Sequence, residues 1–517
     1  MALPSEKFAE SLQVLRDLQE KKNLVAIKSS DISRTHRERL IKNGFLKAVT
    51  RGWYIATNPN EKLGNSTSWY TSFWQFCSQY LRSKYKEAYC VSAEQSILIH
   101  SGNNTVPVQL IVRTPKASNT NINLLYNTSI LAMTSPLPNI AEISEYDGLR
   151  ILTLNSSIVN CSPTMFIKNP MDMRIALAQI SNASEILNIL LDGSHTVIAG
   201  RLAGAFRNNG QGRIADDIVS TMKSAGFNVR EIDPFKNKPI TNLTLKERSP
   251  YESRIKLMWD AMRNVVIKYF PESPGLPQNK EKYLKSIDEI YITDAYHSLS
   301  IERYTVSPKL IEMVKSGSWD LDKNEEHKKH RDAMAARGYY LATLSVKESI
   351  KTILNGNNAG TTVDNDHATW YRNLFSPSVT AGLLKASDLA GYRNDQVYIS
   401  QSRHVPMNKD AVRYVMPIFF ELLKTELNSG VRAVLGHFIF VYIHPYMDGN
   451  GRIARFLMNA MLASGGYPWT VIPVQERQTY MSSLEKASIE RDIEPFTKFI
   501  ANLVYESLKG KPVAKLD

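Results

Sequence analysis

One segment constrains the fold of this 517-residue chain more than any other: residues 436–462, GHFIFVYIHPYMDGNGRIARFLMNAML. Two apolar runs with helical spacing flank a short polar loop, the first ending at His444-Pro445 and the second starting near Ile453. The loop contains two glycines, which allow backbone geometries that a side chain forbids. Because this turn directly precedes a helix, backbone N–H groups and the positive end of the helix dipole converge there. The segment therefore predicts two helices joined by an anion-binding loop.

The polar residues of this loop supply the groups that phosphate chemistry needs. Arg452 and Arg455 are three positions apart, so they share a face at the start of the helix and can present planar donors to phosphate oxygens. Asp448 is unfavourable beside an anion unless a divalent cation bridges the two, as Mg²⁺ does between carboxylates and substrate phosphates. His444 is a titratable base four residues upstream of that acid. Together these residues favour nucleotidyl or phosphoryl transfer.

This stretch resembles the Fic signature, H-x-F-x-D/E-G-N-G-R-x-x-R, with Tyr446 at the Phe position, where a side chain is expected to pack inward. The resemblance extends over roughly residues 280–505. It implies transfer of AMP from ATP to a Ser, Thr or Tyr hydroxyl of a target protein, or of the chain itself, with Mg²⁺ or Mn²⁺ as the cofactor. In this reading His444 is the catalytic base and Asp448 holds the metal. The nucleotide-binding residues that it implies are Asp448, Gly449, Asn450, Gly451, Arg452, Arg455 and Tyr480. For Tyr480, packing in the core is an open alternative.

A second segment, GYRNDQVYISQSRHVP at residues 391–406, looks like the Fic flap, an extended hairpin upstream of the motif. In Fic proteins the flap aligns the target segment by strand addition. The docking residues that the resemblance implies are Val397, Tyr398, Ile399 and Ser400.

A third segment resembles the inhibitory helix of Fic proteins, [S/T]-x-x-x-E-[G/N]. Within a helix expected at about residues 294–303, the chain has Ser298-x-x-x-Glu302. In such proteins the glutamate pairs with the second arginine of the motif, here Arg455, and so removes the cation that would hold the ATP γ-phosphate. Arg303 stands in place of Gly or Asn, which favour a left-handed helix end, so the chain after Glu302 is expected to differ or to continue as helix. A chance helical spacing is the alternative.

The first 60 residues are basic, with 11 Lys and Arg against 6 Asp and Glu. Their pattern predicts a helix, a second helix over residues 33–43 and a hairpin around Thr50-Arg51-Gly52, which together suggest a winged helix-turn-helix. This region resembles the AbiEi type of antitoxin-like regulator, whose winged helix binds an operator. The residues expected to contact DNA are Arg34, Arg37, Arg39 and Arg51. The alternative is a small structural cap with a solvated basic face.

At about 150 residues per domain, the length predicts about three domains. The expected architecture is a winged helix-turn-helix at residues 1–60, an α/β regulator-like domain at 61–245 and a mainly α-helical Fic domain at 246–517. A polar stretch at 233–250 indicates the second boundary. Residues 200–213, GRLAGAFRNNGQGR, are interpreted as a surface loop because no phosphate-loop signature is present.

Composition limits the partners and the compartment. The net charge of +13 permits a polyanionic partner. No apolar run reaches the ~18 residues of a membrane span, and the start lacks a secretory signal. The three cysteines make neither a disulfide framework nor a metal spacing, so a cytoplasmic setting is expected.

Three hypotheses on function stay open at this point. The first is AMP transfer restrained by Glu302. The second is a DNA-binding regulator, or a toxin–antitoxin type protein, in which the Fic core is a sensor. The third is removal of AMP from modified proteins. Fic proteins are often dimers, so a homodimer is a possible assembly.

Overall fold

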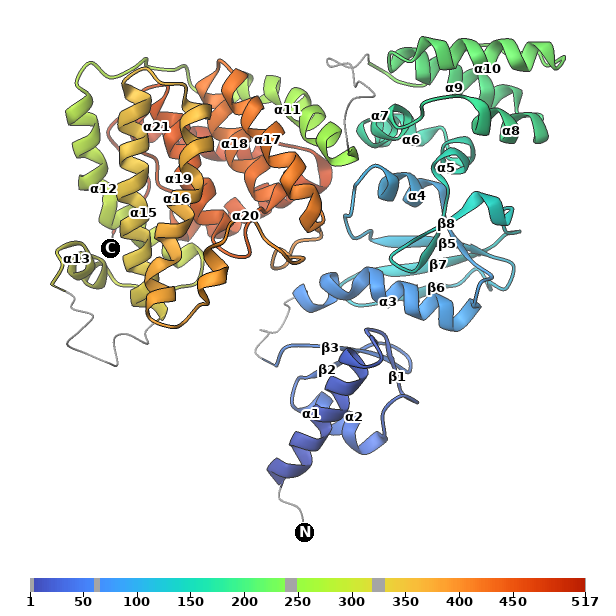
Figure 1. Ribbon diagram of the computed structural model, residues 1–517, viewed down its shortest axis with the longest axis horizontal. Helices are drawn as coiled ribbons and strands as arrows, with labels where there is room; N and C mark the ends of the chain where they lie inside the picture. Colours follow the sequence, from blue (N-terminus) through green and yellow to red (C-terminus); the bar gives the residue numbers. More distant parts are fainter. Residues whose placement is uncertain (1–3, 60–65, 238–248, 319–330, 517) are drawn as a thin grey trace. The chain divides into compact units, whose positions relative to one another are not determined.

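The computed structural model describes residues 4–59, 66–237, 249–318 and 331–516, and the chain divides into two compact units (Figure 1). The first unit comprises Met1–Arg254 with Tyr398–Val405, and the second comprises Ile255–Val397 with Pro406–Asp517. The predicted boundaries after residues 60 and 245 lie outside the described residues, so the three-domain division remains a prediction. No helix in the described ranges is long and apolar enough to cross a bilayer.

The first unit begins with two helices and a small antiparallel sheet of order β1-β3-β2. These elements are α1 (Pro4–Glu20), β1 (Ile27–Lys28), α2 (Arg34–Lys42), β2 (Leu46–Thr50) and β3 (Trp53–Ala56). Ser33 caps α2 by accepting from the His36 N–H at 3.3 Å. Leu15 and Leu18 of α1 pack against Leu40 of α2 in a shared core. The predicted helices and hairpin are present, whereas the identity of this region as a DNA-binding winged helix stays a prediction.

An α/β segment with two further sheets follows in the same unit. Its four-stranded sheet has the order β4-β5-β7-β6, and only β5 and β7 run parallel within it. The elements of this segment are α3 (Thr67–Tyr85), β4 (Cys90–Val91), α4 (Ala93–His100), β5 (Gln109–Thr114), β6 (Asn121–Asn123), β7 (Ser129–Thr134), β8 (Ile143–Tyr146) and β9 (Leu149–Leu152). Aromatic residues of α3, such as Trp69, Phe73 and Phe76, are buried against the four-stranded sheet. This aromatic face explains the aromatic-rich sequence of α3.

Six short helices complete the segment: α5 (Leu154–Asn160), α6 (Thr164–Lys168), α7 (Pro170–Ala178), α8 (Ser184–Asp192), α9 (Thr196–Asn208) and α10 (Gly212–Ser224). The surface-loop interpretation of residues 200–213 was wrong, because most of this stretch belongs to α9. Gly200 and Gly204 face the backbone of residues 230–233, and a Cβ at either position would collide with the carbonyl of Arg230 or Ile232. The glycines thus permit close helix packing, and their presence does not indicate a loop.

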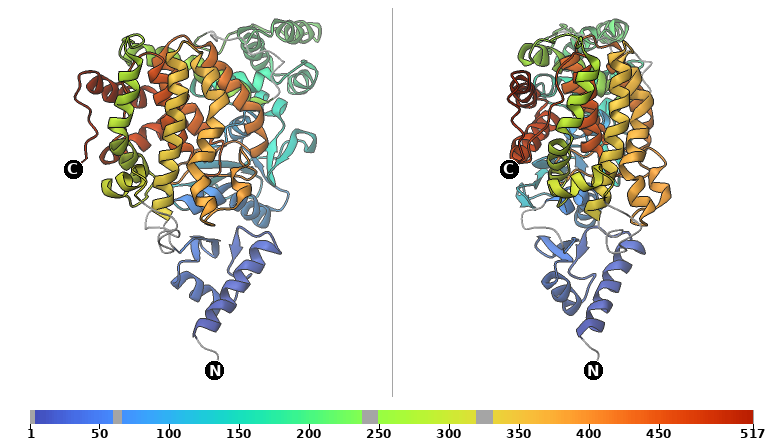
Figure 2. Two further views of the ribbon diagram at one scale, coloured as in Figure 1. Left: turned by 60° about the vertical axis from the view of Figure 1, so that its left-hand side comes forward. Right: turned by 90° about the vertical axis from the view of Figure 1, so that its left-hand side faces the viewer.

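The second unit is helical in its described residues (Figure 2). Its helices are the later part of α11 (Pro250–Tyr269), α12 (Lys280–Ile301), α13 (Pro308–Lys315), α15 (Arg331–Leu354), α16 (Ala359–Thr380), α17 (Lys409–Thr425), α18 (Ser429–Ile443), α19 (Asn450–Ala463), α20 (Arg477–Glu490) and α21 (Glu494–Leu508), with 3-10 turns at Ala386–Leu389 and Val474–Glu476. The long helices α15 and α16 run side by side. Helices α18 and α19 pack against each other at the centre and are buried over most of their length. This central pair carries the motif found in the sequence.

A buried ion pair ties the start of α11 to the α/β segment of the first unit. Arg254 donates from Nη2 to Asp172 Oδ1 at 2.6 Å and to the Ser101 carbonyl at 2.7 Å. The Arg254 and Asp172 side chains are 2% and 0% exposed. Loss of one partner leaves the other charge uncompensated in a low dielectric, which is strongly destabilising.

We expect Asp172→Ala to lower the free energy of unfolding by ~3–5 kcal/mol, because it removes the buried carboxylate that pairs with Arg254 at 2.6 Å. The matched control is Glu20→Ala, which removes an ion pair with Arg16 whose side chains are 65% and 62% exposed. That control should cost no more than about 1 kcal/mol. Urea unfolding measures both, and equal destabilisation by the two changes would contradict the assignment.

Candidate active site

The turn from α18 to α19 holds its shape through two residues in the left-handed backbone region. His444, at the end of α18, has φ 56° and ψ 60°, and Gly449, at the start of α19, has φ 81°. A Cβ at Gly449 would lie 2.7 Å from the Phe375 ring, so both the conformation and the space favour glycine there. The loop therefore reverses direction within five residues and returns its backbone to the start of α19.

The Asn450 side chain fastens this loop from the inside. Its Oδ1 accepts from the Tyr446 N–H at 2.9 Å, and its Nδ2 donates to the Tyr446 carbonyl at 2.8 Å. Asn450 is 2% exposed, so this amide shapes the loop rather than presenting itself to a ligand. Tyr446 is fully buried, as the sequence predicts, and its ring stacks on Tyr371 at 3.9 Å with an interplanar angle of 4°.

A hydrogen bond to the backbone fixes the tautomer of the His444 imidazole. Its Nδ1 lies 3.1 Å from the Val441 carbonyl, which can only accept, so Nδ1 carries the hydrogen and Nε2 keeps its lone pair. Although the side chain is partly exposed, desolvation by the surrounding protein lowers the pKa of His444 to about 4. Nearby Arg393 lowers this pKa further, while Glu302 and Asp448 oppose the shift. The neutral form of the ring is favoured near pH 7.

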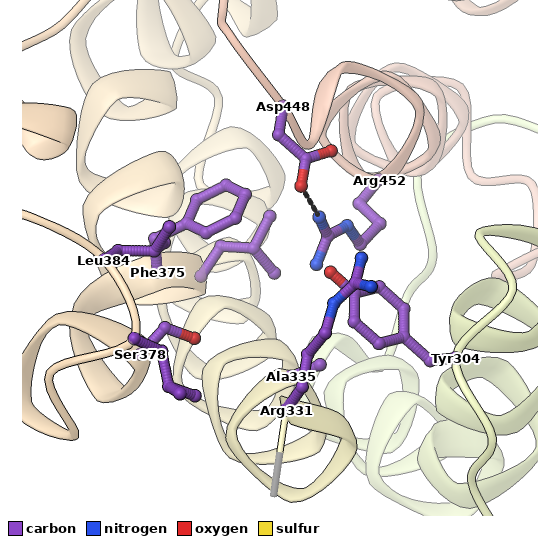
Figure 3. Close-up of a pocket in the computed structure, with 10 residues that line it drawn as sticks. Tyr304, Arg331, Ala335, Phe375, Ser378, Leu384, Asp448 and Arg452 are labelled. Atoms are coloured by element: carbon purple, nitrogen blue, oxygen red, sulfur yellow. Dashed lines mark hydrogen bonds and ion pairs between the residues drawn. The ribbon is translucent and has the colours of Figure 1, made fainter. Parts of the chain in front are cut away.

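Asp448 and Arg452 border a cavity in the second unit (Figure 3). Asp448 Oδ2 lies 3.4 Å from Arg452 Nη2, and the two side chains are 64% and 1% exposed. The Arg452 guanidinium lies between the rings of Tyr304 and Phe375, at 5.2 and 5.0 Å from their centroids. The cavity has a volume of about 320 Å³ and is lined by Tyr304, Arg331, Ala335, Leu374, Phe375, Ser378, Leu383, Leu384, Asp448 and Arg452. Sequence reasoning missed two of these residues: Tyr304, which lies two positions after Glu302, and Arg331, which is the first residue of α15.

An acid fills the anion-binding position that the sequence predicts. Glu302 Oε1 accepts from Arg455 Nη2 at 2.8 Å, and Arg455 Nε also donates to Ser298 Oγ at 2.8 Å. A Cβ on Gly451 would collide with Glu302 Oε1, which places this carboxylate directly over the first turn of α19. Although burial opposes the charge, Glu302 raises the pKa of Arg455 above its ordinary value. The carboxylate occupies a place that suits a phosphate group.

The chain after Glu302 adopts the conformation that Arg303 was expected to disfavour. Helix α12 ends at Ile301, and Arg303 has φ 68°, in the left-handed region. The expectation that arginine would change this helix end was therefore wrong. Contacts of the neighbouring residues over-determine the backbone here, since the Arg477 Nε donates to the Ile301 carbonyl at 2.8 Å and the Arg303 N–H donates to the Ser300 carbonyl at 3.0 Å.

Tyr480 lies in the core of the second unit. Its side chain is 1% exposed, and its hydroxyl lies 2.9 Å from Nε2 of His437. Burial, with a smaller effect of Arg455, lowers the pKa of His437 to about 3, so that ring is neutral. These contacts support the packing alternative for Tyr480. A nucleotide contact by this residue stays a prediction.

The segment predicted as a flap divides between the two units. Val397 belongs to the second unit, whereas Tyr398, Ile399 and Ser400 belong to the first. No strand is assigned among the described residues 391–408, so the expected extended hairpin is not formed. The tip is held within the first unit instead, where the Val106 N–H donates to the Arg403 carbonyl at 3.0 Å. The role of these residues in target docking stays a prediction.

The four arginines predicted to contact DNA all belong to the first unit. Arg34 pairs with Glu38 at 2.7 Å and is 82% exposed, and Arg51 is exposed in the turn between β2 and β3. Arg37 donates to the Ser29 carbonyl at 3.0 Å. Arg39 differs from the others because its guanidinium donates to Ser11 of α1 at 2.7 Å. This bond gives Arg39 a structural role in joining α1 to α2.

A divalent cation fits the carboxylate of Asp448. No group of three or more His, Cys, Asp or Glu that could hold a metal occurs in the described parts of the chain. Asp448 is mostly exposed and lines the same cavity as Arg331 and Arg452. One carboxylate beside bound phosphates is the donor set that Mg²⁺ typically uses.

The comparisons with known proteins concern this part of the chain. Residues 367–462 match the model of the Fic/DOC family. The chain is 40% identical to the protein adenylyltransferase Fic of Drosophila willistoni over 121 aligned residues. The aligned stretch covers 23% of this chain and 24% of that protein. The protein of the same name from Drosophila melanogaster is 39% identical over 121 residues, with the same coverage. The chain thus spans about a quarter of the length of these curated relatives.

Two solved structures show lower similarity. A Fic-1 fragment from C. elegans has a TM-score of 0.37 and 18% sequence identity, and the alignment covers 64% of this chain and 91% of that fragment. A Fic domain containing signaling protein from Bacteroides thetaiotaomicron has a TM-score of 0.36 and 16% identity, and covers 51% and 99%.

We expect the NMR resonances of the His444 ring to stay constant from about pH 8 to about pH 5.5, because an unperturbed histidine titrates near 6.5 and this one near 4. As the pH falls below 6.5, the unfolded chain takes up a proton that folded His444 does not. This residue therefore makes the free energy of unfolding decrease as the pH drops from about 6.5 to about 4. His444→Ala identifies the resonance, and a midpoint near 6.5 would contradict the assignment.

Proposed function

We propose that this chain, whose residues 367–462 form a Fic/DOC domain, is a protein adenylyltransferase that moves AMP from ATP to a hydroxyl group of a target protein. One observation carries the proposal: a neutral base, an exposed carboxylate and two buried arginines converge on the start of α19. The name of the curated relatives supports the same reaction for the matched segment.

The chemistry of transfer follows from the orientation of His444. Its Nε2 lone pair takes the proton from the attacking hydroxyl. The hydroxyl oxygen then bonds to the α-phosphorus of ATP, the bond from that phosphorus to the β-phosphate oxygen breaks, and pyrophosphate leaves. His444 can act near pH 7 without first losing a proton, because desolvation by the surrounding protein lowers its pKa to about 4 and keeps the ring neutral.

The phosphate groups fit the charges at the first turn of α19. Arg452 and Arg455 are 1% and 3% exposed, so their charges act in a low dielectric, where they stabilise a developing negative charge strongly. We assign Arg452 to the β-phosphate and Arg455 to the γ-phosphate. Asp448 would hold Mg²⁺ or Mn²⁺, which offsets charge on the pyrophosphate when bound.

Glu302 acts as an internal brake in this proposal. Its carboxylate is paired with Arg455 and lies over Gly451, in the position that the γ-phosphate needs. A productive triphosphate therefore has to displace Glu302, or bind in another pose. Because Glu302 is 29% exposed in its side chain, it can move toward solvent without unfolding α12.

We expect Glu302→Gly to increase AMP transfer, and His444→Ala to reduce it by ~10²–10⁴-fold, because general base catalysis typically contributes that factor. Intact-mass measurement with Mg-ATP, with and without a cell extract as the source of target, reports each added AMP group. His444→Ala should keep its affinity for ATP.

The control is Glu289→Gly, which introduces glycine at an exposed glutamate within α12, the helix that Glu302 caps. This control should transfer AMP at the unmodified rate. Unchanged transfer in Glu302→Gly would exclude the brake. Loss of AMP from a modified target on adding the unmodified protein would favour removal of AMP as the cellular direction.

We also propose that the N-terminal elements bind DNA. Arg34 and Arg51 favour this function because both are exposed, on α2 and on the hairpin turn, within a stretch of net charge +5. Cations on a helix and a hairpin can reach the phosphates on either side of a groove.

We expect the double change Arg34→Ala and Arg51→Ala to weaken DNA binding. The slope of the logarithm of the binding constant against the logarithm of the salt concentration should become shallower by about 1 for each phosphate that the protein no longer neutralises. Fluorescence anisotropy with duplex DNA at several salt concentrations measures this slope. The control is Arg16→Ala, an exposed arginine of α1. If the control and the double change weaken binding equally, binding is a general effect of charge.

A further inference from the structure

We propose that Arg393 is a positioning residue, whose guanidinium fixes the backbone of His444. It joins the catalytic loop, residues 444–449 between α18 and α19, to both ends of the predicted flap. This inference rests on the proposed transfer of AMP. Arg393 lies in the segment that precedes α17, it is 1% exposed, and it belongs to the second unit together with the residues it contacts.

The first set of contacts reaches the catalytic loop. Arg393 Nε donates to the His444 carbonyl at 2.9 Å, and the Arg393 backbone N–H donates to the Pro445 carbonyl at 2.9 Å. Both acceptors follow the last turn of α18, where carbonyl groups have no partner within the helix. The negative end of the helix dipole points at the same place, so a cation is favoured there.

His444 needs this support because of its conformation. A left-handed backbone is unfavourable for a residue with a Cβ and persists only where the surroundings over-determine it. The two Arg393 contacts fix the carbonyl groups of two consecutive residues, His444 and Pro445. They therefore set the direction in which the imidazole leaves the chain, and with it the position of Nε2.

The second set of contacts reaches the predicted flap. Arg393 Nη1 donates to the Asp395 carbonyl at 3.0 Å, and Nη2 donates to the Met407 carbonyl. Asp395 and Met407 flank the segment 397–405. A further hydrogen bond from Gln396 Nε2 to the Pro406 carbonyl at 2.9 Å also joins the two ends of this segment. One guanidinium thus connects the base of the flap to the residue that would accept the target's proton.

The charge of Arg393 also acts on His444. Burial, together with nearby Arg413, lowers the pKa of Arg393 to about 10, so it stays protonated at neutral pH. Its described hydrogen bonds all go to backbone carbonyl groups, so no carboxylate cancels its charge at hydrogen-bond distance. This cation disfavours a second positive charge on His444, against the opposing effects of Glu302 and Asp448.

A matched arginine at the other end of α18 separates positioning from plain stability. Arg432 is partly buried and donates from Nη1 to the Glu426 carbonyl at 2.5 Å and from Nη2 to Ser464 Oγ at 2.7 Å. Like Arg393, it fastens backbone and helix ends in the second unit. Unlike Arg393, it has no contact with the loop of His444 or with the flap segment among its described bonds.

The test compares Arg393→Lys and Arg393→Gln with Arg432→Lys and Arg432→Gln in the full chain, in the Glu302→Gly background. Lysine keeps the charge but cannot reproduce a planar fork of three donors. We expect both Arg393 variants to lower kcat for AMP transfer by about a hundredfold, the size of effect that a displacement of about 1 Å produces, with KM for ATP unchanged. The Arg432 variants should change the thermal midpoint without this loss of kcat.

A readout independent of activity is amide hydrogen exchange at His444 and Tyr446, whose N–H groups are bonded to the Phe440 carbonyl and to Asn450 Oδ1. Exchange at both amides should become faster in the Arg393 variants and stay unchanged in the Arg432 variants. If Glu302→Gly itself transfers no AMP, the proposed function fails, and the exchange data alone decide on Arg393. Equal exchange in the two pairs of variants, or equal loss of kcat in both, would overturn the positioning role.

Discussion

The reversal of the chain between α18 and α19 is the constraint on which the rest of the second unit depends. Two left-handed residues, His444 and Gly449, bring the end of one buried helix back to the start of the next. Asn450 fastens the loop internally, and Arg393 fastens its first two carbonyl groups from outside. Because both helices are buried, the positions of the base and of the two arginines are fixed by the same packing that forms the core.

The anion-binding position that this reversal creates is occupied by the chain itself. The start of α19 attracts negative charge, and Arg455 adds a buried cation. The Glu302 carboxylate meets both the helix start and this cation, because its Oε1 lies 2.8 Å from Arg455 Nη2 and directly over Gly451. The same electrostatic arrangement would attract a phosphate group, so the contacts that hold Glu302 are the ones that we propose for the phosphate.

The flap segment shows how the two units share one stretch of chain. Its base is joined to the catalytic loop through Arg393, while residues Tyr398–Val405 are part of the first unit. Within that unit, Arg403 exchanges bonds with Val106 through its carbonyl and its side chain, at 3.0 and 2.9 Å. The segment proposed to align a target is therefore not free at its tip.

The sequence by itself identified the polar residues of the loop, the two helices that flank it and the helix that ends near Glu302. The spacing of His444, Asp448, Arg452 and Arg455 is local, and helical periodicity is local too, so both could be read without a structure. The outcome at α9 was decided by tertiary structure, because Gly200 and Gly204 lie in a helix that a backbone segment 30 residues away approaches closely. The same is true of Tyr480, which bonds to His437 in the core, and of Arg303, whose left-handed conformation no local preference of arginine predicts. Arg393 lies inside the segment predicted as a flap, but the resemblance assigns it no role. Its role depends on bringing the His444 carbonyl within 2.9 Å of a residue 51 positions earlier in the chain. Contacts of that kind depend on packing between distant segments, which the order of residues along the chain does not display.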